Sequence, residues 1–211
     1  MILHGYWRST TSYRVRIALN LKGLRYDTET HDLRTGAQRD ERYRHLNPQG
    51  LVPALETHSG VLTQSPAILE WLEEVYPQPP LLPGEPSARA MVRAMVALVA
   101  CDIHPLNNLR VLETLRRDFA ATPDQVNRWI AGWIADGFAA LETLIERHGD
   151  GFAWGDAPTL ADCNLVPQVY SAERFGVDLA PYPRLTGAAE RARALPAFAD
   201  AHPDRQPDAD A

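Results

Sequence analysis

The sequence contains little cysteine and no long apolar run. Its 211 residues include two cysteines, Cys101 and Cys163. Because these lie far apart in apolar helical surroundings, they fit reduced structural thiols better than a disulfide framework or a metal cage. No uninterrupted apolar stretch reaches the roughly 18 residues that a spanning helix requires, and the N-terminus lacks a basic region followed by an apolar signal core. We therefore expect a cytoplasmic chain without a membrane partner.

The sequence also lacks runs of basic residues and metal-binding motifs. A formal net charge of -6 without a Lys/Arg run argues against a nucleic-acid partner and leaves only local clusters such as Arg14 and Arg16. The seven histidines show no ligand spacing such as HExxH, so we expect no metal site. What the chain does have is 45% hydrophobic residues, enough for one globular domain or two small ones.

The segment over residues 6–17 is the strongest candidate for a binding site. Residues 2–7 are apolar and aromatic enough for a strand, and the hydroxyl residues at 9–12 are N-cap candidates for a helix that ends at Gly23. A helix start offers unpaired backbone N–H groups and the positive end of a dipole. It therefore stabilises a thiolate or a carboxylate, with Arg8 as a countercharge. Ordinary helix capping is the alternative.

The next segments predict a mixed sheet with short helices. Alternation predicts a strand over 26–33, and a short charged helix follows over 38–46. Two short strands, 52–56 and 61–63, have hairpin spacing and predict an antiparallel addition to a βαβ start. Ser65 precedes a proline and predicts the N-cap of a second helix that can receive an anion.

A proline-rich segment, 77–86, separates this part from a helical remainder. Proline lacks an amide donor and constrains its neighbours, so we interpret the segment as an interdomain linker. The helices predicted beyond it make an all-α domain and cover 88–103, 106–119, 123–148, 160–169 and 183–194. Thr159 and Asp162 fit a structural capping box better than a catalytic pair. We expect the tail, 199–211, to be peripheral, with disorder at its end.

Several motifs, taken in order, resemble one known family. They are RSTTSYRVRIAL at 8–19, LNP at 46–48 with VP at 52–53, QS at 64–65, LVPQ at 165–168 with AERF at 172–175, and HP and QPD at 202–203 and 206–208. Their order and spacing are similar to those of zeta-class glutathione transferases. The resemblance implies an α/β plus all-α glutathione-transferase fold and a homodimer. A thioredoxin-like N-terminal domain (βαβαββα) would cover 1–80, a linker 81–87 and an all-helical substrate-binding domain 88–211.

The resemblance also implies that glutathione is the cofactor. Ser9 matches the family's serine that hydrogen-bonds the glutathione sulfur, and Thr10 and Thr11 complete that loop, with Arg8 beside it. The family usually has cysteine where this chain has Thr11. A mechanism that needs a protein thiol there, including disulfide exchange, is therefore disfavoured, whereas one that uses glutathione's own thiolate is not.

Other positions match the family's contacts to the rest of the tripeptide. Val52 precedes the family's cis proline, here Pro53, and its backbone pairs with the cysteinyl portion like an added strand. Gln64 and Ser65 match the pair that holds the γ-glutamyl group, which agrees with a carboxylate at a helix start. Gln38 lies where the family contacts the glycine end.

Polar residues interrupt the apolar pattern near residue 104. His104 and Asn108 would share a helix face at i, i+4, whereas Arg110 would point elsewhere, so one ligand cannot meet all three. In the family, the position of His104 approaches the γ-glutamyl end at the subunit boundary. We therefore expect Asp102 and His104 to serve the neighbouring subunit's site, and Asn108 and Arg110 their own. A solvated helix face is the alternative.

The resemblance implies a glutathione-dependent cis–trans isomerase that acts on a maleyl-substituted keto acid. Reversible thiolate addition would permit rotation about the double bond, and the candidate substrate-binding residues are Arg8, Arg110 and Arg174. Arg110 favours maleylpyruvate, which would be converted into fumarylpyruvate. The second carboxylate of maleylpyruvate lies directly on the keto carbon, where a guanidinium can bind it with two hydrogen bonds. The alternatives are isomerisation of maleylacetoacetate, conjugation of small halogenated acids, and a non-catalytic glutathione-binding scaffold.

Overall fold

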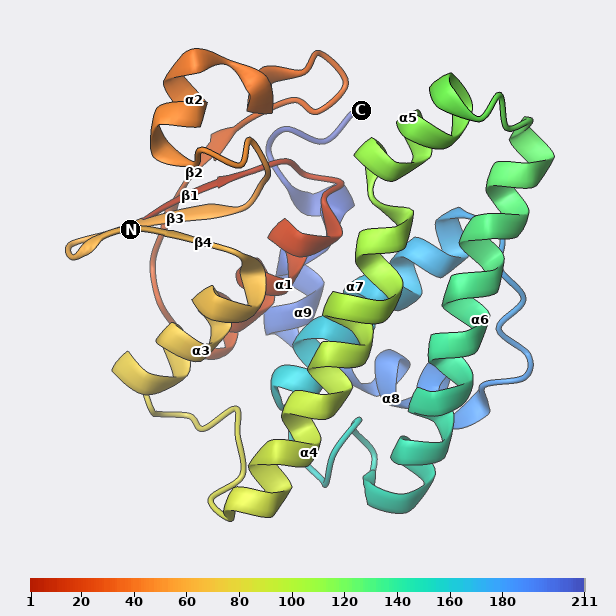
Figure 1. The fold of residues 1–211 in the computed structure, drawn as a ribbon. Coiled ribbons are helices and arrows are strands. Elements are labelled where there is room, and N and C mark those ends of the chain that lie inside the picture. The colour runs from red at the N-terminus through yellow and green to blue at the C-terminus, as the bar shows by residue number, and fades with distance from the viewer. Residues whose placement is uncertain (211) are drawn as a thin grey trace. The chain divides into compact units, whose positions relative to one another are not determined.

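The computed structural model describes residues 1–210, which form two compact units (Figure 1). The N-terminal unit comprises Met1–Leu81 together with the described residues from Arg193 onward, and the helical unit comprises Leu82–Ala192. A mixed unit followed by a helical unit is the predicted fold class. The division differs from the expected one at the C-terminal end, because the chain leaves the helical unit and returns to the N-terminal unit.

A four-stranded mixed sheet forms the centre of the N-terminal unit. Its strands, in the order β2-β1-β3-β4, are β1 (Ile2–Gly5), β2 (Asp27–Thr30), β3 (Ala54–Thr57) and β4 (Gly60–Thr63). β1 is parallel to β2 and antiparallel to β3, and β3 is antiparallel to β4. The predicted βαβ start with an antiparallel hairpin is confirmed.

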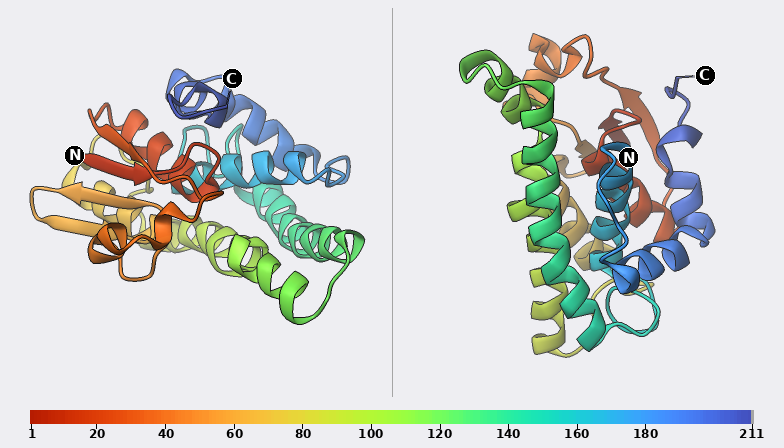
Figure 2. Two further views of the ribbon diagram at one scale, coloured as in Figure 1. Left: turned by 90° about the horizontal axis from the view of Figure 1, so that it is seen from above. Right: turned by 90° about the vertical axis from the view of Figure 1, so that its right-hand side faces the viewer.

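Helices cover both faces of this sheet (Figure 1, Figure 2). The helices α1 (Thr10–Leu21) and α3 (Ser65–Val75) contact each other on one face, and α2 (Glu41–Leu46) lies over the other face after the short 3-10 helix η1 (Ala37–Arg39). The side chains that α1 and α3 bury are largely apolar and include Val15, Ile17, Leu19, Ile68, Leu69 and Leu72. This apolar layer holds the first turns of both helices in place.

The C-terminal segment packs on the N-terminal unit and is not peripheral. Helix α9 (Pro196–Ala201) contacts α1, and Phe198 is fully buried. The Arg16 side chain of α1 donates from Nε to the carbonyl oxygen of Ala201 at 3.0 Å. A single 3-10 turn, η4 (Pro203–Arg205), follows. The expected disordered end includes residue 211, which lies outside the described residues.

The helical unit is built from the segments that the sequence predicts. They are α4 (Pro86–Ala97), the π-helix η2 (Leu98–Ile103), the 3-10 helix η3 (His104–Asn107), α5 (Leu109–Asp118), α6 (Pro123–His148), α7 (Leu160–Arg174) and α8 (Pro183–Arg193). α4 contacts α7, and η2 contacts α6. Gly137 of α6 permits that second contact, because a Cβ atom there would overlap the Ile103 side chain. Both cysteines are free, but only Cys163 is buried, since Cys101 is exposed.

One helical stretch of this unit, Pro86–Asp118, is long and apolar enough to cross a membrane by length and composition alone. Charged residues interrupt it, so it is not a continuous apolar run. A core helix of a folded unit satisfies the same criterion, and Val92, Met95 and Ile103 of this stretch are fully buried.

Candidate functional site

The turn after β1 places hydroxyl groups at the start of α1. Ser9 is the N-cap residue in an extended conformation, and its Oγ accepts a hydrogen bond from the Ser12 amide at 3.2 Å. The predicted capping of this helix is therefore confirmed. The first turn of α1 contains no acidic residue, so the positive end of the helix has no carboxylate of its own. An external anion fits this position.

Thr11 orients the hydroxyl of Ser9. Thr11 Oγ1 donates its only proton to the carbonyl oxygen of Val52 at 3.0 Å. Ser9 Oγ lies 2.9 Å from Thr11 Oγ1 and is therefore the donor in that contact. The Ser9 proton can turn from Thr11 toward an anion bound beside it. Thr10 is the buried first residue of α1, and the peptide bond between Val52 and Pro53 is cis, as predicted.

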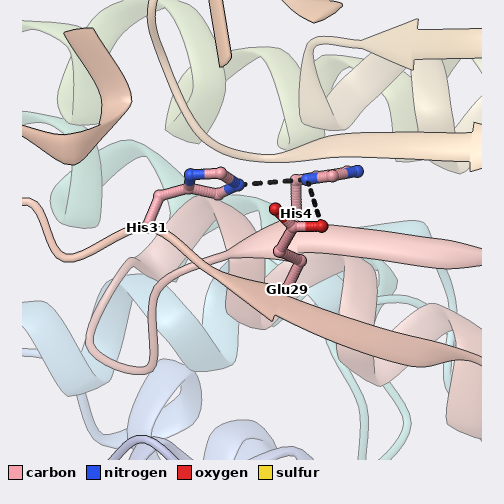
Figure 3. Close-up of side chains that lie close together, drawn as sticks. All are labelled: His4, Glu29 and His31. Atoms are coloured by element: carbon pink, nitrogen blue, oxygen red, sulfur yellow. Dashed lines mark hydrogen bonds and ion pairs between the residues drawn. The ribbon is translucent and has the colours of Figure 1, made fainter. Parts of the chain in front are cut away.

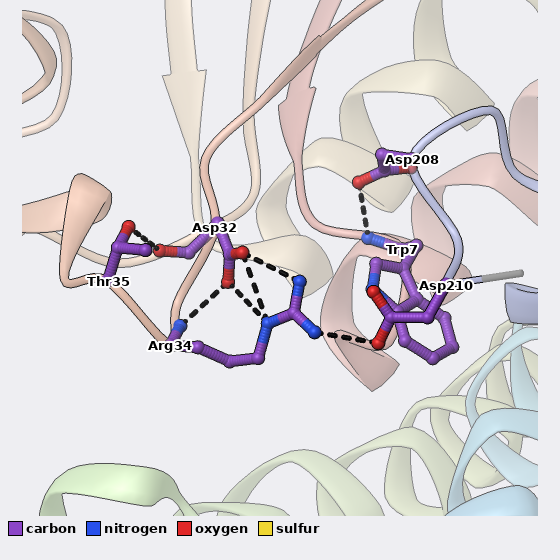
Figure 4. Close-up of polar contacts among 6 residues, drawn as sticks. All are labelled: Trp7, Asp32, Arg34, Thr35, Asp208 and Asp210. Atoms are coloured by element: carbon purple, nitrogen blue, oxygen red, sulfur yellow. Dashed lines mark hydrogen bonds and ion pairs between the residues drawn. The ribbon is translucent and has the colours of Figure 1, made fainter.

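The loop before α1 is held by the C-terminal tail (Figure 4). The Trp7 amide donates to Asp208 Oδ2 at 3.0 Å, and the Trp7 carbonyl accepts from Arg16 Nη2 at 2.9 Å. Half-buried Arg8 places its guanidinium carbon 5.3 Å from the centroid of the Trp7 ring. Sequence reasoning missed this role of the tail, and the QPD motif at 206–208 is the available signal.

Arg34 joins the tail to the segment after β2. It donates to both carboxylate oxygens of Asp32 and, from Nη1, to Asp210 Oδ2 at 2.6 Å (Figure 4). The hydrogen bonds from Arg34 lower the pKa of Asp32, and those to Asp32 and Asp210 raise the pKa of Arg34. Because these side chains reach solvent, the network orients the tail more than it stabilises the fold.

A second helix start lies at the end of β4. Gln64 is its N-cap residue at φ 67°, and α3 begins at Ser65 with Pro66 in its second position. The prediction that Ser65 is the N-cap is therefore wrong by one residue. A positive φ is unfavourable for a residue with a side chain, so this turn is strained. The first turn of α3 also lacks an acidic residue, and Gln64 Nε2 donates to Gln49 Oε1.

Two arginines of α1 are buried and do not form a basic surface cluster. The exposed fractions of Arg14 and Arg16 are 1% and 3%. Arg14 Nη1 donates to Ser65 Oγ at 3.3 Å, which adds a positive charge beneath the start of α3 to that of the helix dipole. Sequence reasoning missed Arg14 as a site residue, because nothing in the local pattern signals a contact with a residue 51 positions away.

Gln38 lies in η1 and is buried. Its Oε1 has no hydrogen-bond partner among the described residues. A buried polar atom without a partner costs free energy unless a ligand supplies a donor. The backbone N–H of a peptide ligand would satisfy this oxygen. A tripeptide that carries a thiol and carboxylates would fit the Gln38 oxygen, the hydroxyls at 9–11 and the helix start at 64–65.

The chain around residue 104 is not a regular helix, so one prediction is wrong. His104 opens a 3-10 turn after the π-helix η2, and Asn108 is extended. Pro105 lacks an amide proton and cannot continue the α-helical pattern. His104 and Asn108 therefore do not share one helix face. Asn108 instead caps α5, where its Oδ1 accepts from the Arg110 amide at 3.1 Å.

The other candidate residues of the helical unit lie on its surface. Asp102 and Arg110 are exposed, and His104 is half-buried. Arg174, in the last turn of α7, is also exposed, with its guanidinium carbon 4.8 Å from the centroid of the Phe175 ring. A guanidinium keeps its charge at any physiological pH, so both arginines are suited to an anionic ligand.

The start of α7 is a closed capping box, as predicted. Asp162 is fully buried, and its Oδ2 accepts from the Thr159 amide at 2.8 Å and from Thr159 Oγ1 at 3.1 Å. Its Oδ1 accepts from the Ala153 amide at 2.8 Å. Loss of hydration on burial raises the pKa of Asp162 to about 6, although these hydrogen bonds act in the opposite direction. The pair is structural, because its polar atoms are used within the chain.

Comparisons with known proteins show the family of this chain. Residues 8–75 match the family described as glutathione S-transferase, N-terminal domain. A maleylacetoacetate isomerase from Pseudomonas aeruginosa is 54% identical over 212 residues, covering 99% of this chain and 98% of its own. A maleylpyruvate isomerase from a Ralstonia species is 50% identical over 210 residues, covering 99% of both chains. The holo structure of a maleylpyruvate isomerase, a bacterial zeta-class glutathione transferase, shares 50% identity with a TM-score of 0.97 over 100% of both chains.

Proposed function

This chain belongs to the zeta-class glutathione transferase family of maleylpyruvate and maleylacetoacetate isomerases, and we propose that it converts maleylpyruvate into fumarylpyruvate with glutathione as cofactor. The observation that carries the proposal is the start of α1. Ser9 and Thr11 present hydroxyls there, and the first turn of the helix has no acidic residue. The turn also contains no cysteine, so it has no protein thiol for disulfide exchange.

Four features of the N-terminal unit are suited to glutathione. The Ser9 hydroxyl and the start of α1 suit the sulfur. The backbone of Val52, beside the cis proline, suits the cysteinyl portion. The amides at Ser65, with Arg14 beneath them, suit the γ-glutamyl carboxylate. The buried Oε1 of Gln38 suits the amide of the glycine end.

Bound glutathione supplies a thiolate whose reversible addition to the cis double bond allows rotation to the trans isomer. With glutathione bound, Ser9 would donate a hydrogen bond to the sulfur, and the positive end of α1 would lower the pKa of the thiol. During addition, negative charge moves onto the conjugated carbonyl of the substrate. Arg8 is our candidate for stabilising this developing negative charge more strongly than it stabilises the bound substrate. No protein residue has to transfer a proton.

We propose maleylpyruvate as the substrate because of Arg110. Its exposed guanidinium, at the start of α5, can clamp the carboxylate on the keto carbon with two hydrogen bonds, and Arg174 offers a further positive charge. Maleylacetoacetate, which places that carboxylate one carbon further out, is the alternative. The high identity to a maleylacetoacetate isomerase favours this second candidate.

A kinetic comparison of the two substrates, with and without glutathione, tests the proposal. We expect no isomerisation without glutathione and a higher kcat/KM for maleylpyruvate. Arg110→Ala should raise the KM for maleylpyruvate and leave glutathione affinity intact, whereas Arg116→Ala, which alters an exposed arginine in the last turn of the same helix, should change neither. Activity undiminished without glutathione would contradict the mechanism. Glutathione binding without any turnover would favour a scaffold.

We further propose that the chain acts in the cytoplasm as a homodimer. Asp102 and His104 would reach the glutathione of the neighbouring subunit. Asn108, whose Oδ1 is engaged in capping α5, would use its amide group within its own subunit. Sedimentation analysis combined with calorimetric titration of glutathione tests this division. A monomeric variant that retains full glutathione affinity would contradict it.

A further inference from the structure

Three side chains of types that can bind a metal ion meet in a part of the N-terminal unit that the proposed function does not use (Figure 3). His4 comes from β1, Glu29 from β2, and His31 directly follows β2. His4 Nδ1 lies 3.0 Å from His31 Nε2 and 3.9 Å from Glu29 Oε2. All three potential ligand atoms lie within 4.8 Å of one another.

Backbone pairing fixes this arrangement. The parallel register of β1 and β2 places His4 directly opposite Glu29, so both side chains project from the same face of the sheet. The amide of His31 donates to the carbonyl oxygen of Gly5 at 2.8 Å, which continues the pairing beyond the strand. The exposed fractions of His4 and His31 are 1% and 8%. The cluster is therefore held on rigid elements and not on a mobile loop.

The hydrogen bonds of His4 determine which nitrogen can bind a cation. Glu56 Oε1 lies 2.7 Å from His4 Nε2 and accepts the proton of that nitrogen. His4 Nδ1 then presents a lone pair, so the proton between the two rings belongs to His31 Nε2. A metal ion can replace that proton and bind both nitrogens. A carboxylate on the other ring nitrogen is the usual companion of a metal-binding histidine.

The distances and the surroundings suit a small divalent ion. Zinc bonds to histidine nitrogen at about 2.0–2.1 Å in tetrahedral geometry, which holds two ligand atoms roughly 3.3 Å apart. The observed separations of 3.0 Å and 3.9 Å lie on either side of that value. A cavity of about 740 Å³ is lined by the cluster and by residues of α2, so a water molecule can supply a fourth ligand.

We propose that His4, His31 and Glu29 form a binding site for a zinc-type divalent transition metal ion, with Glu56 orienting His4. Two imidazoles and one carboxylate are a donor set that zinc accepts. The ion ties β1 to the segment that follows β2. The cavity beside the cluster is lined by none of the residues at 9–11, and the metal site does not depend on the proposed isomerase activity.

The test uses the untagged, metal-stripped protein. Calorimetric titration with Zn²⁺ should show one ion per chain, and Co²⁺ should give the visible absorption bands of a four-coordinate site. His31→Gln and Glu29→Gln should each weaken Zn²⁺ binding at least about tenfold. The matched controls His45→Gln and Glu41→Gln alter residues that line the same cavity outside the cluster, and they should bind Zn²⁺ like the wild type.

Two results would overturn the proposal. One is the absence of stoichiometric Zn²⁺ binding by the wild type, and the other is an equal loss of affinity in His45→Gln and His31→Gln, which would place the ion elsewhere. Circular dichroism and glutathione binding report on the fold of each variant. If His31→Gln is misfolded, Glu29→Gln decides, because its side chain is 45% exposed and can be replaced without disturbing the core.

Discussion

Two helix starts in this protein share a sequence pattern and differ in chemistry. The start of α1 has Ser9 as its N-cap and the start of α7 has Thr159, and each hydroxyl accepts a hydrogen bond from its own first turn. At the third helical position α7 has Asp162, which closes the capping box, whereas α1 has Ser12. The start of α7 is therefore closed by its own carboxylate, and the start of α1 accepts an anion from outside.

The comparison teaches that a hydroxyl N-cap does not by itself distinguish a structural helix start from a binding site. In this pair the difference is the acidic residue of the first turn, which α7 has and α1 lacks. The first turn of α3 also has no acidic residue, and Arg14 donates to Ser65 beneath it.

Removal of the Ser9 hydroxyl should have the largest effect. In Ser9→Ala the sulfur loses a donor, so turnover should fall roughly 10²–10³-fold, about 2.7–4 kcal/mol. The dissociation constant of glutathione should change far less, because the other contacts remain. Steady-state kinetics and ultraviolet titration of the bound thiolate measure both quantities, with Ser59→Ala, in the exposed turn between β3 and β4, as the control. An unchanged rate and an unchanged pKa of the bound thiol in Ser9→Ala would show that Thr10 or Thr11 donates to the sulfur instead.

The closed helix start should make stability depend on pH. Burial raises the folded-state pKa of Asp162 from 3.8 to about 6, so the folded protein retains a proton that the unfolded chain releases. This contribution is fully present below the unfolded pKa and is lost as the pH rises through about 6, amounting to roughly 3 kcal/mol at most. Urea unfolding at stepped pH measures it. The idea fails if the unfolding free energy of the wild type does not fall relative to that of Asp162→Asn as the pH rises from 3.8 to about 6.

At neutral pH, Asp162→Asn should open the capping box of α7. Asparagine offers one accepting oxygen where aspartate offers two, so a buried donor of Thr159 or Ala153 loses its partner. The cost should be about 1–3 kcal/mol of unfolding free energy, with kcat per folded molecule unchanged. Asp178→Asn is the control, because Asp178 accepts from the Ala180 amide in an exposed turn. A loss of activity at full folding would contradict a purely structural role.

A carboxylate added to α1 should make its start resemble that of α7. Thr11 occupies the second helical position beside Ser9, and Thr11→Asp places a negative charge where the thiolate would bind. The pKa of bound glutathione should rise by about one unit, with a roughly tenfold lower rate at neutral pH. Thr11→Val also loses the bond to Val52, since valine has no donor, but it adds no charge. Equal losses in the two variants would assign the effect to the bond to Val52.

The features predicted correctly from the sequence are those with local signals. Helix α6 has the bounds that the helical pattern predicts, Pro123–His148, and the Thr159–Asp162 box follows from residues three positions apart. The predicted N-cap of α3 is wrong by one residue, because the turn from β4 imposes the positive φ of Gln64. The π and 3-10 geometry over 98–107 was not predicted, because no local pattern separates it from an α-helix.

The sequence by itself determined the order of strands and helices and the hydroxyl turn at 9–12, because periodicity and capping act over short distances. It also determined the family resemblance, because motif order is read directly along the chain. Only the tertiary structure decided which distant residues meet. It brought Arg14 beneath Ser65 and placed the Asp208 carboxylate on the Trp7 amide. It also joined the histidines at 4 and 31, which the parallel register of two strands sets side by side without any spacing motif. Strand register and packing create such contacts, and neither is visible in a local pattern.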